Sequence, residues 1–237
     1  MIYHHVGVPP PSARYHGLYV APWQLDYQIR VMKWLGFRFS TLQDAVATNA
    51  SGKIACLTFD DGFKDNIEVA LPILRQHHVP ATVFVVAGDV GKTNLRWDEA
   101  GETTPGNLMG WAELKALMAA GWEIGSHGQE HRHLALLAQS AQRQNILGSY
   151  DVIARELGTP PQTFAYPFGS FDETTLACLR DSPYIAAVST KAGINWSLDE
   201  RYRLRRIALK GHRLRHLAQP FKIVASRADL RRTLQAN

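Results

Sequence analysis

Short apolar runs alternate along the chain with longer segments of helical periodicity. Each run is long enough for one strand, and each longer segment is long enough for one helix. The strand-like runs lie near residues 2–6, 54–58, 82–87, 122–125, 163–165, 185–189 and 205–209. The helical segments lie near residues 22–35, 66–77, 111–120, 140–157 and 172–181. This order predicts an α/β fold with helices covering a parallel sheet, and it leaves open whether the sheet closes into a barrel.

The length and the charge fit one domain over residues 1–237 with a basic end. A chain of 237 residues matches one barrel-sized domain, and no run of eighteen apolar residues suggests a membrane span. The net charge is +5, and residues 200–237 hold eleven Lys and Arg against two acidic residues. We expect this basic segment to be solvated, or else to contact phosphates or an anionic membrane surface. Nucleic-acid binding is not expected, because no matching fold signature accompanies the charge.

Two adjacent aspartates, Asp60 and Asp61, stand between an apolar run and Gly62. Neighbouring side chains on an extended backbone point to opposite sides, so we expect one carboxylate to bind a metal while the other faces water or substrate. Two like charges this close are costly unless a cation or a proton transfer uses them. Taken alone, the pair also fits a solvated turn.

Three histidines, His127, His131 and His133, follow a later strand-like run. On one helical turn, His127 and His131 would lie on the same face and could share one ion. With Asp61 they make three ligands for a divalent metal, which leaves positions open for water and substrate as in catalytic zinc sites. Taken alone, the histidines also fit a polar surface loop, and His133 stays outside the predicted ligand set.

The segment TFAYPFG at residues 163–169 runs from an apolar strand into a proline and a glycine. The backbone is therefore expected to turn sharply, and such a turn can present an N–H group to a ligand. Taken alone, the segment also fits an ordinary turn from a strand into a loop.

These three segments resemble, in order, the TFDDG, HxxxH and aromatic-Pro-Phe-Gly blocks of the polysaccharide deacetylase family. That family comprises metal-dependent carbohydrate esterases and includes the chitooligosaccharide deacetylases. The resemblance spans essentially the whole chain and continues in residues 91–94, 97–98, 108–111, 190–195 and 204–207. It implies a single-domain distorted (β/α) barrel with fewer than eight regular units, in which the loops after the strands carry the chemistry.

The resemblance also implies a role for each motif residue. Asp60 would be the general base that deprotonates the attacking water, while Asp61, His127 and His131 would bind the metal. The backbone N–H of Phe168 would help to stabilise the oxyanion. These roles match what amide hydrolysis needs: a polarised carbonyl, an activated water and a proton for the leaving nitrogen. Zn²⁺ is the expected metal, although two histidines and one aspartate also accept Co²⁺, Ni²⁺, Mn²⁺ or Fe²⁺.

The proton donor departs from the common family pattern. Many members place it in a C-terminal Leu-x-His motif, but His212 and His216 here lie in a strongly basic stretch that does not read as a strand end. The start of the chain, Tyr3-His4-His5, resembles the subgroup that deacetylates poly-β-1,6-N-acetylglucosamine, whose permuted barrel carries the acid on its first strand. We therefore predict His4 as the acid and His5, on the other side of the strand, as a structural residue. The late histidines remain the alternative.

A second departure concerns the partner of the base. Ala165 stands where the third motif often begins with an arginine, as it does in the subgroup with the N-terminal histidine. Arg206 is predicted to supply the missing guanidinium to Asp60. A solvated arginine in an Arg-rich segment is the alternative.

Substrate binding is predicted at aromatic residues around the site. The segment 88–110 is long for a loop in a compact domain, and we expect it to form a wall or lid over the cleft. Trp97 and Trp196 are predicted to stack on a sugar ring, with simple anchoring of their loops as the alternative. Tyr166 and Pro167 complete the predicted substrate-binding set.

The start of the sequence bears on location. No leader precedes the first strand-like run, so if Met1 is the native start we expect a cytoplasmic enzyme. Its substrate would then be a precursor: a lipid-linked or nucleotide-linked sugar, or a small N-acetylated saccharide. Cys56 and Cys178 read as small core residues, which fits this expectation.

Three functions are open at this point. The first is metal-dependent N-deacetylation of N-acetylhexosamine units in a glycan or a glycan precursor. The second is hydrolysis of another C–N bond by the same fold, as by a deformylase or an amidase, which only a substrate panel separates from the first. The third is a catalytically silent carbohydrate-binding protein, which is disfavoured because the predicted base and all predicted ligands are present.

Overall fold

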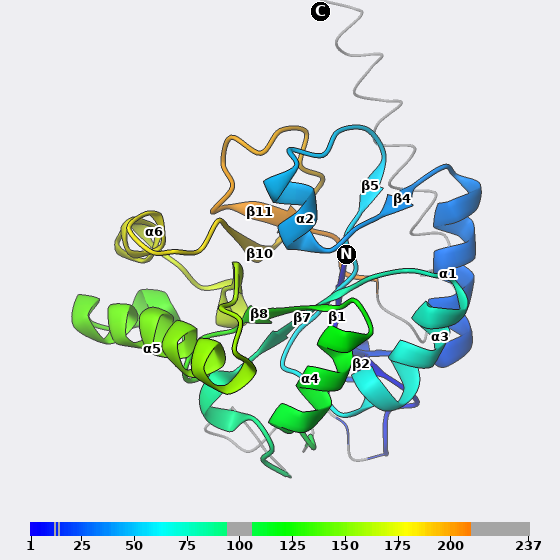
Figure 1. Ribbon diagram of the computed structural model, residues 1–237, viewed down its shortest axis with the longest axis horizontal. Coiled ribbons are helices and arrows are strands. Elements are labelled where there is room, and N and C mark those ends of the chain that lie inside the picture. Colours follow the sequence, from blue (N-terminus) through cyan, green and yellow to red (C-terminus); the bar gives the residue numbers. More distant parts are fainter. Residues whose placement is uncertain (12, 14, 94–105, 210–237) are drawn as a thin grey trace, which may run out of the picture.

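The computed structural model describes residues 1–209 apart from 12, 14 and 94–105. Its main sheet has seven parallel strands in the order β1-β6-β7-β8-β9-β10-β11 (Figure 1). The strands are β1 (Ile2–Tyr3), β6 (Thr58–Phe59), β7 (Thr82–Val85), β8 (Glu123–Ser126), β9 (Thr163–Ala165), β10 (Ala186–Ala192) and β11 (Leu204–Arg206).

The first strand also meets the segment that follows the last one. Ile2 forms a parallel bridge with Ala208, and its N–H donates to the carbonyl of Ile207 at 3.0 Å. The sheet is therefore nearly closed into a barrel. The predicted single-domain α/β fold, a distorted barrel with fewer than eight regular units, is confirmed.

The helices lie around this barrel as the periodicity predicts. They are α1 (Pro22–Trp34), the π-helical turn η2 (Asn66–Ala70) with α3 (Leu71–Gln76), α4 (Trp111–Ala119), α5 (Gln139–Leu157) and α6 (Glu173–Arg180). Figure 1 shows α1 and α3 on one side of the barrel and α5 and α6 on the opposite side. Each of these segments ends within one residue of its predicted bounds. In the described part of the chain, no helix is both long and apolar enough to cross a membrane.

The sequence did not predict strand β3 (Tyr19–Val20), strand β4 (Arg38–Phe39) or helix α2 (Leu42–Ala47). The partners of the missed strands, β2 (His5–Val6) and β5 (Ile54–Ala55), lie within the predicted runs at 2–6 and 54–58. Both runs are divided, because β2 pairs with β3 and β5 with β4, whereas β1 and β6 enter the barrel. The missed strands β3 and β4 have two residues each, which is too short to leave a readable alternation. The single-turn 3₁₀ helices are η1 (His16–Leu18), η3 (Ala87–Asp89), η4 (Leu134–Leu136) and η5 (Pro167–Gly169).

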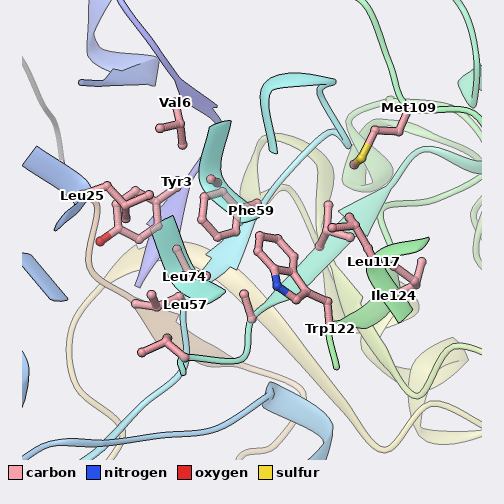
Figure 2. Close-up of a cluster of buried hydrophobic side chains, with 14 of the residues drawn as sticks. Tyr3, Val6, Leu25, Leu57, Phe59, Leu74, Met109, Leu117, Trp122 and Ile124 are labelled. Carbon is pink, nitrogen blue, oxygen red and sulfur yellow. The ribbon is translucent and has the colours of Figure 1, made fainter. Parts of the chain in front are cut away.

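Alternate residues of the barrel strands point outward to the helices. Tyr3 stacks on Phe59 with a 5.2 Å centroid distance, and Phe59 stacks on Trp122 at 5.2 Å (Figure 2). Leu25 of α1 and Leu74 of α3 belong to the same buried cluster. This outer layer anchors β1 and β6, the two strands that lead into the predicted acid and the predicted base.

The other strand residues fill the narrow barrel interior. Phe84 is fully buried there with Ala165, and Leu42 and Val46 of α2 pack into the same cluster. A Cβ at Gly125 would lie 2.5 Å from the Phe84 ring, so the glycine makes room for this side chain.

A buried carboxylate closes the end of the barrel at which the strands begin. Glu123 Oε2 accepts hydrogen bonds from Thr82 Oγ1 at 2.7 Å and from the N–H of Gln43, in the first turn of α2, at 2.9 Å. Thr163 Oγ1 donates to Glu123 Oε1. Burial raises the pKa of Glu123, and these hydrogen bonds only partly oppose the shift. Because this end is filled, the open end lies at the carboxyl ends of the strands, where barrels carry their active sites.

Candidate metal centre

Asp60 and Asp61 follow β6 at the open end of the barrel. Asp61 has φ +77°, a left-handed conformation, and is not the extended residue that the alternation argument assumed. That part of the prediction is wrong. The left-handed backbone costs about 1–2 kcal/mol for a residue with a side chain, although aspartate tolerates it better than most. Both carboxylates are nonetheless buried, at 2% and 6% exposure.

His127 follows β8, and the segment that leads from it to His131 is a loop. The predicted helical turn is therefore wrong, because Gly128 adopts φ +86° and a Cβ there would lie 2.3 Å from Asn145 Oδ1. Asn145, on α5, holds this loop: it accepts from the Gln129 N–H at 2.9 Å, and its Nδ2 donates to a loop carbonyl at 3.0 Å. The two histidines meet because the loop is pinned to α5.

The structure brings Asp61, His127 and His131 together as one possible cation-binding group. Their candidate ligand atoms all lie within 4.8 Å of one another. Asp61 Oδ1 is 3.4 Å from His127 Nε2 and 3.6 Å from His131 Nε2. Within the described residues, this buried oxygen accepts no hydrogen bond. His127 Nδ1 donates to the carbonyl of Ala165 at 2.7 Å, which leaves the lone pair of neutral His127 on Nε2. A buried, unpaired carboxylate oxygen facing imidazole nitrogens fits a divalent cation.

The pKa values of the group reflect its burial and its mutual charges. Burial lowers the pKa of His127, but the close contact with the Asp61 carboxylate and the negative charge of Asp60 outweigh this effect and raise it overall. Burial lowers the pKa of His131 to about 4, against the opposing charge of Asp61. Burial raises the pKa of Asp61, but His127 and the other histidines lower it overall. The cluster therefore favours one positive charge beside an ionised carboxylate, a charge that a bound cation can supply instead of a proton.

Asp60 is paired with Arg206 and is not a member of this group. The guanidinium donates to Asp60 Oδ1 at 2.6 Å and to Oδ2 at 2.7 Å. It also donates to Thr58 Oγ1 at 2.9 Å and to the Ser189 carbonyl at 3.0 Å, and its exposure is only 4%. Burial raises the pKa of Asp60, but the charge and hydrogen bonds of Arg206 outweigh this and lower it overall. Arg206 therefore contacts the predicted base and is not solvated.

His4 lies between β1 and β2 at the same end of the barrel. Burial lowers its pKa, while the charges of Asp61 and Asp60 oppose that change, so His4 lies within electrostatic reach of both carboxylates. His5 points elsewhere: its Nδ1 is 2.7 Å from Asp65 Oδ2. The structure thus brings His4 toward the carboxylates, whereas His212 and His216 lie outside the described residues.

Phe168 has φ +58°, a second left-handed residue at this end of the barrel. Its ring stacks on His133 at a centroid distance of 4.0 Å and meets His131 edge-on at 4.3 Å. Among the described residues, no hydrogen bond uses the Phe168 N–H as donor. The predicted oxyanion donor therefore follows β9 beside the metal group, and the Phe168 side chain is 42% exposed.

Two of the predicted substrate-binding residues, Tyr166 and Pro167, are buried in the structure. Tyr166, directly after β9, is fully buried, and its hydroxyl donates to the Tyr202 carbonyl at 2.6 Å, so this prediction is wrong. The cause is strand alternation, which turns Ala165 inward and Tyr166 outward. Pro167 is also buried, where it begins η5.

One of the two predicted tryptophans, Trp196, lies away from the metal group. Trp196 lines a separate hollow of about 410 Å³ together with residues 49–54, and no member of the metal group lines that hollow. Trp97 lies outside the described residues, as do most of the predicted lid at 88–110 and of the basic segment at 200–237.

Sequence reasoning missed two asparagines that support the site. Asn145 holds the loop between the histidines, and Asn66 holds the backbone of His4. Both lie within helical segments, where an asparagine resembles any other polar position, so no pattern singled them out.

A cation-binding group of two histidines and one aspartate, beside a second paired carboxylate, is typical of metal-dependent hydrolases. The chain belongs to the polysaccharide deacetylase family, because the family model for polysaccharide deacetylase matches residues 47–187.

The chain is also similar to named proteins. It is 25% identical over 193 residues to the poly-β-1,6-N-acetyl-D-glucosamine N-deacetylase of Staphylococcus aureus (strain MRSA252), which covers 75% of this chain and 60% of that protein. It is 26% identical over 184 residues to YxkH of Bacillus subtilis (strain 168), which covers 74% of this chain and 61% of that protein. The chain thus spans about 60% of the length of these relatives.

Solved structures give a fuller overlap. The Streptococcus pyogenes deacetylase PplD, in complex with acetate, superimposes with a TM-score of 0.77 at 27% identity and covers 93% of this chain and 96% of that one. IcaB from Ammonifex degensii has a TM-score of 0.76 at 24% identity and covers 94% of each chain, a likeness of fold.

Proposed function

We propose that this protein is a metal-dependent N-deacetylase acting on N-acetylhexosamine units of a glycan or a glycan precursor. The observation that carries the proposal is the meeting of Asp61, His127 and His131 beside the Arg206-bound Asp60. Membership in the polysaccharide deacetylase family supports the same reaction.

Asp61, His127 and His131 would hold the metal, with Zn²⁺ expected first and Co²⁺, Ni²⁺, Mn²⁺ or Fe²⁺ as alternatives. When bound, the cation polarises the acyl carbonyl and makes a water acidic enough to react near neutral pH. The proposed base, acid and oxyanion donor are all residues of the chain.

Asp60 is the proposed general base. The paired Arg206 keeps its carboxylate ionised and fixes its two oxygens, so that it can accept a proton from the attacking water. The Phe168 N–H is the proposed donor to the oxygen on which negative charge develops.

His4 is the proposed acid. As the C–N bond breaks, the leaving nitrogen would otherwise depart as an unstable amide anion, so it needs a proton. His4 lies within electrostatic reach of both carboxylates, and its lowered pKa makes its protonated form a stronger acid than an exposed histidine.

The substrate is proposed from chemistry and from the relatives. The similarity to a poly-β-1,6-N-acetyl-D-glucosamine N-deacetylase favours a β-linked N-acetylglucosamine unit. Lipid-linked and nucleotide-linked N-acetylhexosamines remain in the proposal as alternative substrates.

The test is acid release by the purified protein from a panel of β-1,4- and β-1,6-linked N-acetylglucosamine oligomers, a nucleotide-linked N-acetylhexosamine and an N-formyl sugar. Each is assayed with zinc, cobalt or nickel, and with Asp60→Asn as the blank. Metal-dependent acetate release that is lost in Asp60→Asn supports the proposal. Release of formate alone would replace it with a deformylase, and binding of oligomers without any acid release would point to a binding protein.

A further inference from the structure

Asn66 joins the loop that follows the base to the strand that carries His4. It opens the π-helical turn η2 and is fully buried. Its Nδ2 donates to the His4 carbonyl at 2.8 Å and to Asp65 Oδ1 at 2.8 Å. One amide group therefore ties the backbone at His4 to the segment that begins with Asp60 and Asp61.

Asp65 makes a second set of contacts to the same strand segment. Its Oδ1 accepts from the Val6 N–H at 3.2 Å, and its Oδ2 lies 2.7 Å from His5 Nδ1. The His5 ring lies between two aromatic rings, with centroid distances of 4.2 Å to Tyr19 and 3.6 Å to Phe63. His5 is thus fixed on both faces and by its ring nitrogen, which restrains the backbone next to His4.

The loop is also tied to β1 at its other end. The Asp60 N–H donates to the Tyr3 carbonyl at 3.0 Å. The segment 60–66 therefore contacts the chain before His4 through Asp60 and the chain at and after His4 through Asn66 and Asp65. A π-helical turn is rare and is frequent at functional sites, which fits a role for this local conformation in the contact.

We propose that Asn66, supported by Asp65, is a positioning residue that fixes the His4 imidazole relative to Asp60. The inference rests on the proposed function, in which His4 is the acid. In the reaction, the water oxygen bonds to the acyl carbon and its proton passes to Asp60. The C–N bond then breaks with its electron pair on nitrogen, and that nitrogen takes its proton from His4. A displaced His4 imidazole therefore slows C–N cleavage and leaves the attack of water unaffected.

Two substrates with different leaving groups separate these steps. An N-acetylglucosamine oligomer needs the proton from His4, whereas 4-nitrophenyl acetate releases a stable phenolate and needs no acid. For His4→Ala we expect kcat on the amide to fall by ~100-fold or more, the usual contribution of a general acid, and kcat on the ester to change by less than about 3-fold. For Asn66→Ala we expect kcat on the amide to fall by ~10-fold or more and kcat on the ester to show the same small change as in His4→Ala.

The double variant tests whether Asn66 acts through His4. In a His4→Ala background, Asn66→Ala should cause no further loss on the amide, because there is no imidazole left to position. Bound metal, measured by elemental analysis, should stay unchanged in all three variants. Asn145→Ala is the contrast: it loosens the loop that bears His131, so it should lower bound metal and slow both substrates together.

The outcomes distinguish the two proposals. If His4→Ala slows both substrates alike or neither, the acid assignment fails, and with it the proposed role of His4. If His4→Ala is selective but Asn66→Ala slows both substrates alike, or adds a full further loss in the double variant, positioning by Asn66 is overturned. Should Asn66→Ala not fold, Asp65→Asn carries the same test, because it weakens the contacts to Val6 and His5 while keeping the side-chain shape.

Discussion

Arg206 binds both carboxylate oxygens of Asp60, at 2.6 and 2.7 Å, although the two residues lie 146 positions apart in the sequence. Arg206 ends β11, and Asp60 follows β6, and β1 lies between these strands when the sheet closes. The ion pair therefore forms only when the barrel is complete. The charge state of the proposed base depends on closure of the fold.

The first prediction concerns the acid side of the pH–rate profile. In Arg206→Met, burial of Asp60 is no longer opposed by the guanidinium, so the pKa of Asp60 should rise instead of being lowered. The base then becomes protonated at a higher pH, and kcat/KM should still increase with pH in a range where the native enzyme is flat. The measurement is kcat/KM against pH with saturating metal.

Arg206→Lys is the matched control, because it keeps the positive charge but loses the paired hydrogen bonds. Its acid limb should lie between those of the native enzyme and Arg206→Met. Removing one partner of a buried ion pair costs about 3–5 kcal/mol, so Arg206→Met should also show a lower Tm. Identical acid limbs in all three proteins would show that Arg206 does not set the charge of the base.

The second prediction separates two neighbouring carboxylates. Asp60→Asn should lower kcat by ~100-fold or more with metal still bound, because Asp60 pairs with Arg206 and lies outside the metal group. Asp61→Asn should lose bound metal, because it removes the charged oxygen between the two histidines. Elemental analysis after dialysis, together with acetate release, measures both effects. Metal loss in Asp60→Asn would move that residue into the ligand set.

The barrel itself was predictable because its signals are local. Each strand that joins the closed sheet overlaps a predicted strand-like run, and each covering helix has a periodic segment of its own. Helix α2 was missed although Thr41 and Asp44 form a start signal, in which Thr41 Oγ1 accepts from the Asp44 N–H at 3.2 Å. A helix of six residues has too few turns to show a periodic face.

The metal group was predictable in its members, Asp61, His127 and His131, but not in its local geometry. Spacing suggested a helical turn for the histidines, but the left-handed Gly128 and its contact with Asn145 make the segment a loop. No feature of the sequence linked Gly128 to a residue on α5. The outward position of Tyr166 could have been found, because the chain is extended there and Ala165, the residue before it, faces the barrel interior.

The third prediction tests the loop that brings His131 to the metal group. Gly128→Ala requires a side chain at φ +86° and places its Cβ 2.3 Å from Asn145 Oδ1. We expect a loss of about 1–3 kcal/mol in the free energy of unfolding and a weaker affinity for metal, because the loop must shift. Denaturant unfolding and metal titration measure the two effects.

Gly158→Ala provides the control for Gly128→Ala. Gly158 also has positive φ, at +73°, but a Cβ there meets nothing within 4 Å. Gly158→Ala should therefore lower the free energy of unfolding through the same cost of a side chain at positive φ, with no change in metal affinity. Equal metal affinities in the two variants would mean that the Asn145 contact does not position the loop.

The last prediction concerns stability and uses Glu123, far from the metal group at the filled end of the barrel. Burial raises the pKa of Glu123 in the folded protein, so the folded state binds its proton more tightly than the unfolded state does. The resulting stability is fully present below the unfolded pKa, near 4.5, and is lost as the pH rises through the folded pKa.

In Glu123→Gln the amide oxygen can still accept from Gln43 and Thr82 without any charge. Above pH 4.5 the free energy of unfolding of the variant should therefore rise relative to that of the native protein, by at most about 1.4 kcal/mol per pH unit. The difference in Tm between the two proteins should increase in the same direction. Glu173→Gln, which removes the same charge from a side chain that is 77% exposed and pairs with Arg203, is the surface control. A Tm difference for Glu123→Gln that is flat from pH 4 to pH 8 would contradict the raised pKa.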